Sequence, residues 1–324
     1  MAGKKITEDQ LPELSLKGAP KKAVLQTIKQ AFNCFVDFEA LKKKRKPFAV
    51  KMNSLHLSKN LTANKHDSSI ENCGTDFMLE GFGRGMMRFS RRFDWLYRHY
   101  EWAQRVPVIP NRRARIVDLG CDVGEIRKIM SSSFYYKNPL YVGVDLDHTR
   151  LMQGFQAIVS ARTPAMYVQH DMTYPLGFIK SGTVDCVFFG EVIEHFEQKY
   201  AVKVLKEIKR ILRPKGRFFI STPNARNTVG KFPFHIREYS PPELRTMVKK
   251  AGLGIIRVYG WSGTEKTILK NMSKEHRKFY DEVTKNMSKD LVMSAFCHMD
   301  VDVANAFCLE GAKPPKFSKK KKKG

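Results

Sequence analysis

The chain has 324 residues, of which 42% are hydrophobic, so it can bury one large core with appendages. Its 58 Lys and Arg outnumber 32 Asp and Glu, giving a formal net charge of +26. This excess favours a polyanionic partner, nucleic acid first, and the alternative is a surface charged for solubility. We expect no membrane protein, because no apolar stretch approaches the ~20 residues that span a bilayer and the N-terminus lacks the apolar segment of a signal peptide.

Residues 1–80 are basic and weakly patterned, which predicts a partly disordered N-terminal extension. One amphipathic stretch is compatible with a helix, with apolar residues at Val24, Ile28, Ala31, Phe32 and Phe35. The run Lys42–Pro47 is rich in lysine and arginine. It is compatible with a phosphate-binding patch, a nuclear localisation signal or a solvated loop.

A helical pattern begins at Gly81 and continues to Gln104. Its apolar residues recur at three- and four-residue spacing, at Phe82, Met86, Phe89, Phe93, Leu96, Tyr97 and Tyr100. We expect this stripe to pack on the core that follows, in preference to stacking on bases. Arginines are interleaved with it, at Arg84, Arg88, Arg91, Arg92 and Arg98. On the opposite face of the helix they would form a phosphate-binding surface.

A short apolar run that ends in an acid starts the best-patterned part of the chain. The run is Arg115–Leu119, and it leads through Asp118 into Gly120, Asp122 and Gly124. The pattern predicts a buried strand, a tight loop and then a helix. Glycine suits such a loop because the backbone must turn sharply and let a ligand approach without a Cβ in the way.

Two further strands also end beside acids. Leu140–Asp145 closes on Asp145, and the apolar run at 165–169 is followed by Asp171. The first and second acidic strands are separated by about the length of one βαβ unit. An acid at the end of the second strand can accept hydrogen bonds from both ribose hydroxyls of a nucleoside.

These strand ends resemble those of the class I S-adenosylmethionine-dependent methyltransferases. That family carries acid-x-Gly-x-Gly-x-Gly in the first loop, and here Asp122 replaces the middle glycine, a residue that tolerates positive φ better than most. The resemblance covers roughly residues 112–311 and implies an α/β fold: a Rossmann-like, seven-stranded sheet with helices on both faces. It also implies S-adenosylmethionine as cofactor, with the binding residues Asp118, Gly120, Gly124, Asp145, Asp171 and Glu191. A dinucleotide-binding fold is disfavoured because Gly-x-Gly-x-x-Gly is absent.

The rest of the core alternates strand and helix signals. We expect helices at 149–160, 200–212 and 241–251, and strands at 184–189, 217–221, 254–259 and 303–309. A proline–glycine turn is predicted at 213–216, and Ser240 with Glu243 predicts a capping box. A polar helical insertion is expected at 264–290. These elements give a methyltransferase domain at 81–311, followed by a disordered lysine-rich tail at 312–324.

The loop after the strand at 184–189 carries the candidate catalytic group. Glu191, Glu194 and His195 form Glu-x-x-Glu-His, and His235 lies downstream. Two carboxylates and two imidazoles suit Mg²⁺ or Mn²⁺, with the imidazoles favouring Mn²⁺, and a bound metal would lower the pKa of a hydroxyl acceptor. The alternative is a metal-free role, in which His195 or His235 acts as general base or positions the acceptor. The arrangement resembles that of the small-RNA 3′-terminal 2′-O-methyltransferases and the ubiquinone-pathway O-methyltransferases.

Together these features predict an S-adenosylmethionine-dependent methyltransferase that acts on nucleic acid, with RNA favoured over DNA because a ribose 2′-hydroxyl suits the Glu/His loop. The loop contains neither the Asn/Asp-Pro-Pro-aromatic run of amino-methyltransferases acting on bases nor a cysteine nucleophile. The alternatives are a small-molecule or protein O/N-methyltransferase and a non-catalytic RNA-binding protein on a methyltransferase fold. We expect a cytoplasmic protein, with a nuclear location left open by the basic runs. The sequence specifies no oligomeric state.

Overall fold

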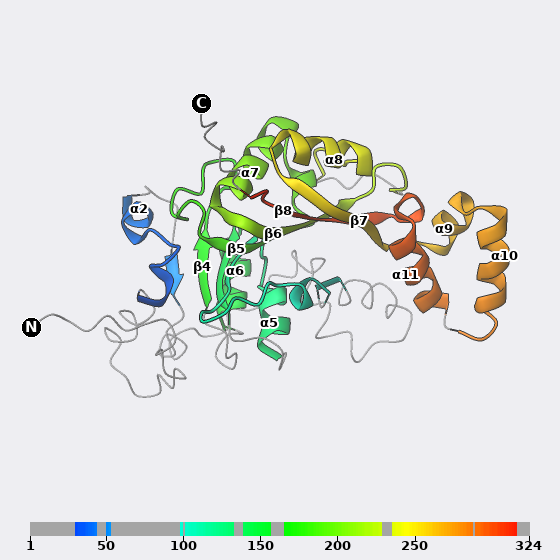
Figure 1. The fold of residues 1–324 in the computed structure, drawn as a ribbon, viewed down its shortest axis with the longest axis horizontal. Coiled ribbons are helices and arrows are strands. Elements are labelled where there is room, and N and C mark those ends of the chain that lie inside the picture. The colour runs from blue at the N-terminus through cyan, green and yellow to red at the C-terminus, as the bar shows by residue number, and fades with distance from the viewer. Residues whose placement is uncertain are drawn as a thin grey trace, which may run out of the picture.

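The computed structural model describes residues 30–43, 50–52, 98–99, 101–132, 139–156, 165–228, 235–287 and 289–315. Within these ranges one mixed sheet organises the chain, with strand order β1-β4-β3-β2-β5-β6-β8-β7 (Figure 1). The strands are β1 Val50–Met52, β2 Arg115–Leu119, β3 Leu140–Asp145, β4 Ala165–Gln169, β5 Val184–Gly190, β6 Leu212–Pro223, β7 Gly254–Ser262 and β8 Ala306–Ala312. The helices are α2 Phe38–Lys43, α5 Glu125–Ser132, α6 His148–Gln156, α7 Gln198–Ile211, α8 Pro241–Lys250, α9 Glu265–Asn271, α10 Lys274–Val283 and α11 Lys289–Met299.

The centre of the sheet is parallel. Strands β4, β3, β2, β5 and β6 pair in parallel, and β8 runs antiparallel between β6 and β7. This confirms the expected seven-stranded α/β sheet, to which β1 adds an antiparallel edge strand beside β4. The strand order reverses at β2, whose neighbours are β3 and β5. Ligands bind outside the carboxyl ends of the strands at such a reversal.

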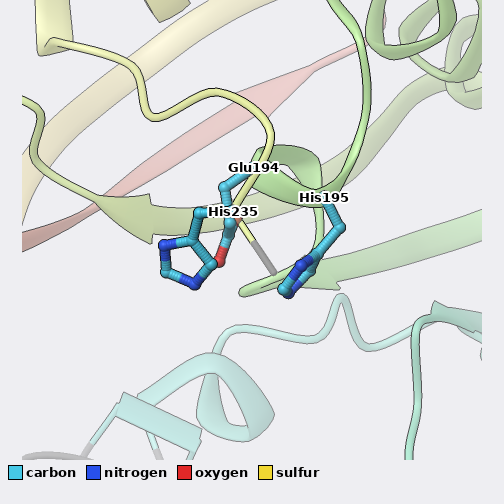
Figure 2. A group of neighbouring side chains, drawn as sticks. All are labelled: Glu194, His195 and His235. Carbon is cyan, nitrogen blue, oxygen red and sulfur yellow. The ribbon is translucent and has the colours of Figure 1, made fainter. Parts of the chain in front are cut away.

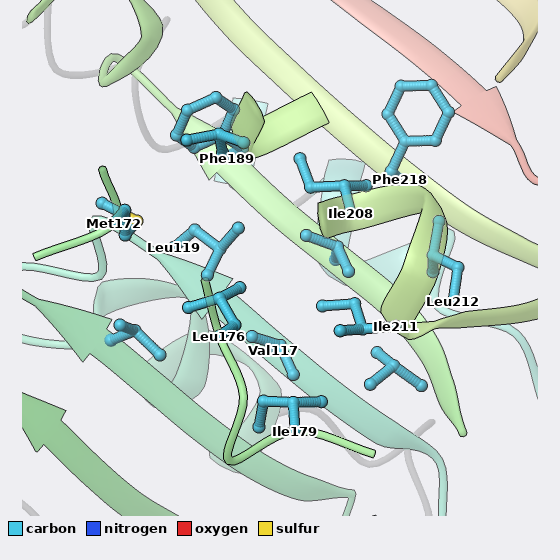
Figure 3. Packing of buried hydrophobic residues seen from close by; sticks show 14 of the residues in the cluster. Val117, Leu119, Met172, Leu176, Ile179, Phe189, Ile208, Ile211, Leu212 and Phe218 are labelled. Atoms are coloured by element: carbon cyan, nitrogen blue, oxygen red, sulfur yellow. The ribbon is translucent and has the colours of Figure 1, made fainter. Parts of the chain in front are cut away.

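Alternate residues of the central strands face two separate hydrophobic clusters. Val117 and Leu119 of β2 belong to the first cluster, which Figure 3 shows, and Ile116 belongs to the second. Helices α7 and α8 cover the first face, while α5 and Trp102 pack on the second (Figure 1). Burial on both faces explains why the strands read as continuous apolar runs.

The helices begin and end where their sequence signals lie. The buried residues of α7 recur at helical spacing, at Ala201, Val204, Leu205, Ile208 and Ile211. The predicted capping box of α8 is present, since the Ser240 N–H donates to Glu243 Oε2 at 2.8 Å. Among the helices that the structure describes, none has the length and hydrophobicity needed to cross a bilayer.

The predicted proline–glycine turn after α7 lies inside β6 as an irregular segment. Between the pairs Val184–Leu212 and Cys186–Arg217, β6 has more residues than β5. Lys215 takes up the surplus in a left-handed conformation, with φ of 62°. The chain is therefore paired with β5 on both sides of the turn, as at a β-bulge.

The C-terminal part of the core also differs from the prediction. Strand β8 starts at Ala306, because residues 301–303 form a 3₁₀ turn in which Asp300 Oδ1 accepts from Asp302 N at 2.9 Å. The helical insertion is longer than expected, since α11 continues to Met299. Helices α9 to α11 form a small hydrophobic cluster of their own and lie beyond β7 at one end of the molecule (Figure 1).

Part of the N-terminal extension packs on the core. Phe32 and Phe35 are fully buried in the same cluster as Phe178, and Val36 pairs with Ile179 in an isolated bridge. The other N-terminal features lie outside the described residues: most of the basic run at 42–47, the apolar stripe at 82–100 and every arginine interleaved with it except Arg98. The lysines at 319–323 lie outside them as well.

Candidate functional site

The loop after β2 has the tight geometry that its glycines predict. Gly120 and Gly124 are left-handed, with φ of 71° and 73°. A Cβ at Gly120 would lie 2.2 Å from Val192 Cγ2, and one at Gly124 would lie 2.2 Å from Tyr167 Oη. Both positions therefore require glycine, for conformation and for space. The contact with Val192 also shows that the loop after β2 abuts the loop after β5.

Asp122 occupies the position of the missing middle glycine and is also left-handed, with φ of 50°. The buried Arg150 of α6 binds its carboxylate with two hydrogen bonds, from Nε to Oδ1 and from Nη2 to Oδ2, the latter at 2.9 Å. Such a bidentate ion pair neutralises the carboxylate. The arginine therefore compensates for the acidic residue that replaces glycine in this loop.

Asp145 and Asp171 close neighbouring strands at the same edge of the sheet. Asp145 Oδ2 accepts from Asp122 N at 2.8 Å and its Oδ1 accepts from Asp147 N at 3.0 Å, so this side chain organises the glycine loop. Burial raises the pKa of Asp145, and these backbone hydrogen bonds oppose the rise. Asp171 Oδ1 accepts from the backbone N and the Oγ1 of Thr173, at 2.8 and 2.7 Å. Both carboxyl groups are partly exposed at the sheet edge.

Asp118 lies deeper than the other acids. Only 5% of it is exposed, and Tyr141 Oη donates to its Oδ2 at 2.6 Å. Desolvation raises the pKa of Asp118 to about 7, against the opposing hydrogen bond from Tyr141. Asp118 is thus a buried acid whose carboxylate binds Tyr141, unlike the partly exposed Asp145 and Asp171.

The four predicted catalytic or metal-binding residues do not all converge. One ligand atom from each of Glu194, His195 and His235 lies within 4.8 Å of the others (Figure 2). Glu191 is outside this group, because Arg98 Nη1 donates to its Oε1 at 2.9 Å and holds the carboxylate. Of the four predicted residues, the structure thus brings three together, and a role for Glu191 as a fourth ligand stays a prediction.

Glu194 anchors the loop that brings His235 to the site. Ile236 N and Arg237 N both donate to the Glu194 backbone oxygen, at 2.9 and 3.0 Å. These bonds fold the segment after β6 back over the carboxyl edge of the sheet. The Glu194 side chain is 1% exposed, and Thr222 Oγ1 donates to its Oε2 at 3.0 Å. Burial, with the nearby charge of Glu191, raises the pKa of Glu194 well above its usual range.

His235 is held by a carboxylate that the sequence analysis did not identify. Its Nδ1 lies 2.8 Å from Glu238 Oε1, and both side chains are largely buried, with 14% and 17% exposed. The tautomer that donates from Nδ1 to Glu238 carries no hydrogen on Nε2. The rings of His235 and His195 meet edge to face, with centroids 5.2 Å apart (Figure 2). A carboxylate that orients an imidazole in this way is typical of a general base or a metal ligand.

Two further residues beside the site, Arg98 and Arg150, were also missed as site residues. Arg150 belongs to no motif, and its only sequence signal is its place in the helix after the second strand. Arg98 was expected on a solvent-facing, phosphate-binding surface, yet it is 2% exposed. That expectation is wrong for Arg98, because its guanidinium lies over the Trp261 ring at 4.4 Å and points into the core.

Comparison with known proteins decides the family. A family model described as a methyltransferase domain matches residues 95–258, half of the chain. The chain belongs to the class I S-adenosylmethionine-dependent methyltransferases. A probable S-adenosylmethionine-dependent methyltransferase of Mycolicibacterium smegmatis is 32% identical to it over 120 residues, which are 35% of this chain and 43% of that protein. The chain thus matches less than half the length of this curated relative.

Several solved methyltransferases are similar to this chain at low sequence identity. A methyltransferase in complex with the Haloferax volcanii Trm112 activator is 15% identical, with a TM-score of 0.46 over 70% of this chain and 95% of that one. An S-adenosylmethionine-dependent methyltransferase from Archaeoglobus fulgidus is 15% identical, with a TM-score of 0.47 over 74% and 100%. The small RNA methyltransferase HEN1 is 13% identical, with a TM-score of 0.47 over 69% and 25%. The assignment of this chain to the family rests on the matching methyltransferase-domain model.

Proposed function

We propose that the methyltransferase acts on nucleic acid, on RNA in preference to DNA, and that the acceptor is a hydroxyl such as the ribose 2′-hydroxyl. The observation that carries the nucleic-acid part is the net charge of +26. The group Glu194–His195–His235 supports the hydroxyl part, because a hydroxyl must lose a proton to become a good nucleophile.

The residues at the sheet edge fit S-adenosylmethionine by their chemistry. Asp145 and Asp171 present partly exposed carboxylates, which are acceptors for the ribose hydroxyls and the adenine amino group respectively. Gly120 and Gly124 leave two positions of the loop without a Cβ, so a ligand can approach the backbone there. The cofactor supplies a methyl group on a positively charged sulfur, and the chain's own task is to position that group and the acceptor in line.

His235 is our candidate for the base that takes the acceptor proton. Glu238 orients its ring through Nδ1, so Nε2 is the nitrogen that would receive the proton. As the oxygen–carbon bond forms and the carbon–sulfur bond breaks, the proton stays on His235, where the Glu238 carboxylate stabilises the resulting imidazolium. Glu194 and Thr222 hold the loop that carries this dyad.

A metal site is the second candidate role for this group, supported by the convergence of Glu194, His195 and His235. One carboxylate and two imidazoles favour Mn²⁺ over Mg²⁺. We favour the metal-free base, because Arg98 already binds Glu191, the fourth predicted ligand. We therefore expect full activity and an unchanged melting temperature in the presence of chelator. Loss of activity together with a lower melting temperature in chelator would assign a metal site instead, provided that Mn²⁺ restores both better than Mg²⁺ does.

Salt titration tests the nucleic-acid acceptor. If the enzyme neutralises about six phosphates, its affinity for total RNA should fall roughly 10³-fold between about 50 and 200 mM salt. The measurement is fluorescence anisotropy with the full-length protein. A control variant with serine at positions 319–323 separates the lysine run from the rest of the chain. A flat salt response would favour the small-molecule or protein O/N-methyltransferase alternative.

A further inference from the structure

Arg98 is a buried cation that the chemistry of the site has not yet explained. Its guanidinium lies over the rings of Trp261 and Trp102, at 4.4 and 5.3 Å from their centroids. Burying a charge is costly unless it is paired and hydrogen-bonded, and buried ion pairs often stabilise a fold no better than apolar residues do. Stability alone is therefore a weak reason for a charged group at this position.

Arg98 contacts residues of two other elements at the carboxyl edge of the sheet. Arg98 lies in the helical segment before β2, which the structure describes at 98–99 and 101–104. Its Nη1 donates to Glu191 Oε1 at 2.9 Å and to Ser221 Oγ of β6 at 2.7 Å. Its Nη2 lies 3.2 Å from His99 Nε2. Glu191 directly follows β5, and its side chain is 31% exposed. The carboxylate is therefore held from inside and open to solvent on its other side.

The backbone of Glu191 is also unusual. It is left-handed, with φ of 56°, a strained conformation for a residue with a Cβ. Its N–H donates to the Ser221 backbone oxygen at 2.9 Å, so Ser221 fixes the backbone of Glu191 and shares Arg98 with its side chain. Such conformations persist where the surroundings over-determine them, and they cluster at active sites.

The position of Glu191 connects it with the cofactor loop. The next residue, Val192, lies against Gly120, so the two loops share one edge of the sheet. Arg98 also lies near two further acids of this edge: its charge lowers the pKa values of Asp118 and Glu194 against the rise that burial causes. The guanidinium is thus ion-paired with the partly exposed Glu191 and lies near two buried acids, Asp118 and Glu194.

We propose that Arg98 is a positioning residue for methyl transfer, which holds the Glu191 carboxylate at the mouth of the cofactor site and thereby couples the helical segment before β2 to the loop after β5. The inference concerns the transfer step and does not depend on RNA being the acceptor. Glu191 acts at the reacting end of the site, and Arg98 acts through Glu191.

A double-mutant cycle tests this coupling. Arg98→Met and Glu191→Gln should each lower the transfer rate at saturating S-adenosylmethionine by about tenfold or more. The rate of the double variant should lie within about threefold of that of the slower single variant, because both changes remove the same interaction. Arg98→Lys should recover part of the rate, since an ammonium can still donate to Glu191. The reaction uses tritiated S-adenosylmethionine and whichever pool the wild type labels among total RNA, DNA, protein and small metabolites.

Arg105→Met is the matched control, because Arg105 directly follows the same helical segment and forms ion pairs with Glu101 and Glu310. It should lower the melting temperature and leave the rate unchanged. Calorimetric titration with S-adenosylmethionine measures the cofactor affinity of the same variants without an acceptor. The loss of affinity in the double variant should be smaller than the product of the two single losses by about threefold or more. Additive losses in rate or in binding would overturn the role of Arg98. An absence of label in RNA alone would overturn only the proposed acceptor.

Discussion

Replacing His235 by alanine should lower the rate of methyl transfer by about 10²–10⁴-fold, the range for loss of a general base. His235 has its Nδ1 2.8 Å from Glu238 and belongs to the only group of potential ligands, with Glu194 and His195, found among the described residues. Affinity for S-adenosylmethionine should be nearly unchanged, because the cofactor residues lie on other strand ends. The measurement is the single-turnover rate with tritiated S-adenosylmethionine, beside calorimetric titration of the cofactor.

Two variants sharpen the result for His235. Glu238→Gln should lower the rate less than His235→Ala does, because the imidazole remains and loses only the carboxylate that orients it. His298→Ala is the matched control, since His298 packs its ring on Tyr259, with centroids 4.7 Å apart. It should leave the rate unchanged. A His235→Ala enzyme with the wild-type rate would contradict the base assignment and would favour an amine acceptor, which needs no base of this kind.

Replacing Asp145 by alanine should weaken binding of S-adenosylmethionine at least tenfold, equivalent to about 1.4 kcal/mol. The variant would lose charge-assisted hydrogen bonds to the ribose hydroxyls. It would also lose the acceptor for the N–H groups of Asp122 and Asp147, so the glycine loop would be less ordered. Isothermal titration calorimetry on the purified variant measures the effect directly.

Asp147→Ala provides the control for Asp145. Asp147 lies two residues further along the same turn and is exposed, with its Oδ1 accepting from Thr149 N at 2.7 Å at the start of α6. Its replacement should change cofactor affinity by less than about threefold. Asp145→Asn should fall between the two, because it keeps an acceptor oxygen and loses the charge. Equal affinities for the Asp145→Ala variant and the wild type would place the ribose elsewhere.

Most of the fold could be predicted because its strands are buried on both faces. Leu140–Asp145 and Ala165–Gln169 have the bounds expected from their apolar runs, and Ser240 with Glu243 marked the start of α8. The segment between α7 and the body of β6 was predicted as a turn because proline and glycine usually interrupt a strand. Pairing with β5 overrides that local preference here.

The candidate site was harder to predict because its decisive contacts join distant positions. The sequence analysis grouped Glu191 with Glu194, but Glu191 is left-handed and precedes the 3₁₀ turn that starts at Ile193, and its carboxylate binds Arg98 from a distant part of the chain. The interleaving of arginine with aromatic residues gave no means of deciding that Arg98 turns inward. Arg150 compensates Asp122 from another helix, and no local pattern indicates such a pair.

The most direct test of the proposed function is a labelling experiment with four acceptor pools. The full-length methyltransferase is incubated with tritiated S-adenosylmethionine and, in separate reactions, with total RNA, total DNA, protein and small metabolites, with the His235→Ala variant as a blank. We predict label in RNA that resists mild acid and sits on a ribose oxygen after nuclease digestion. Label confined to the small-metabolite or protein reactions would contradict the account.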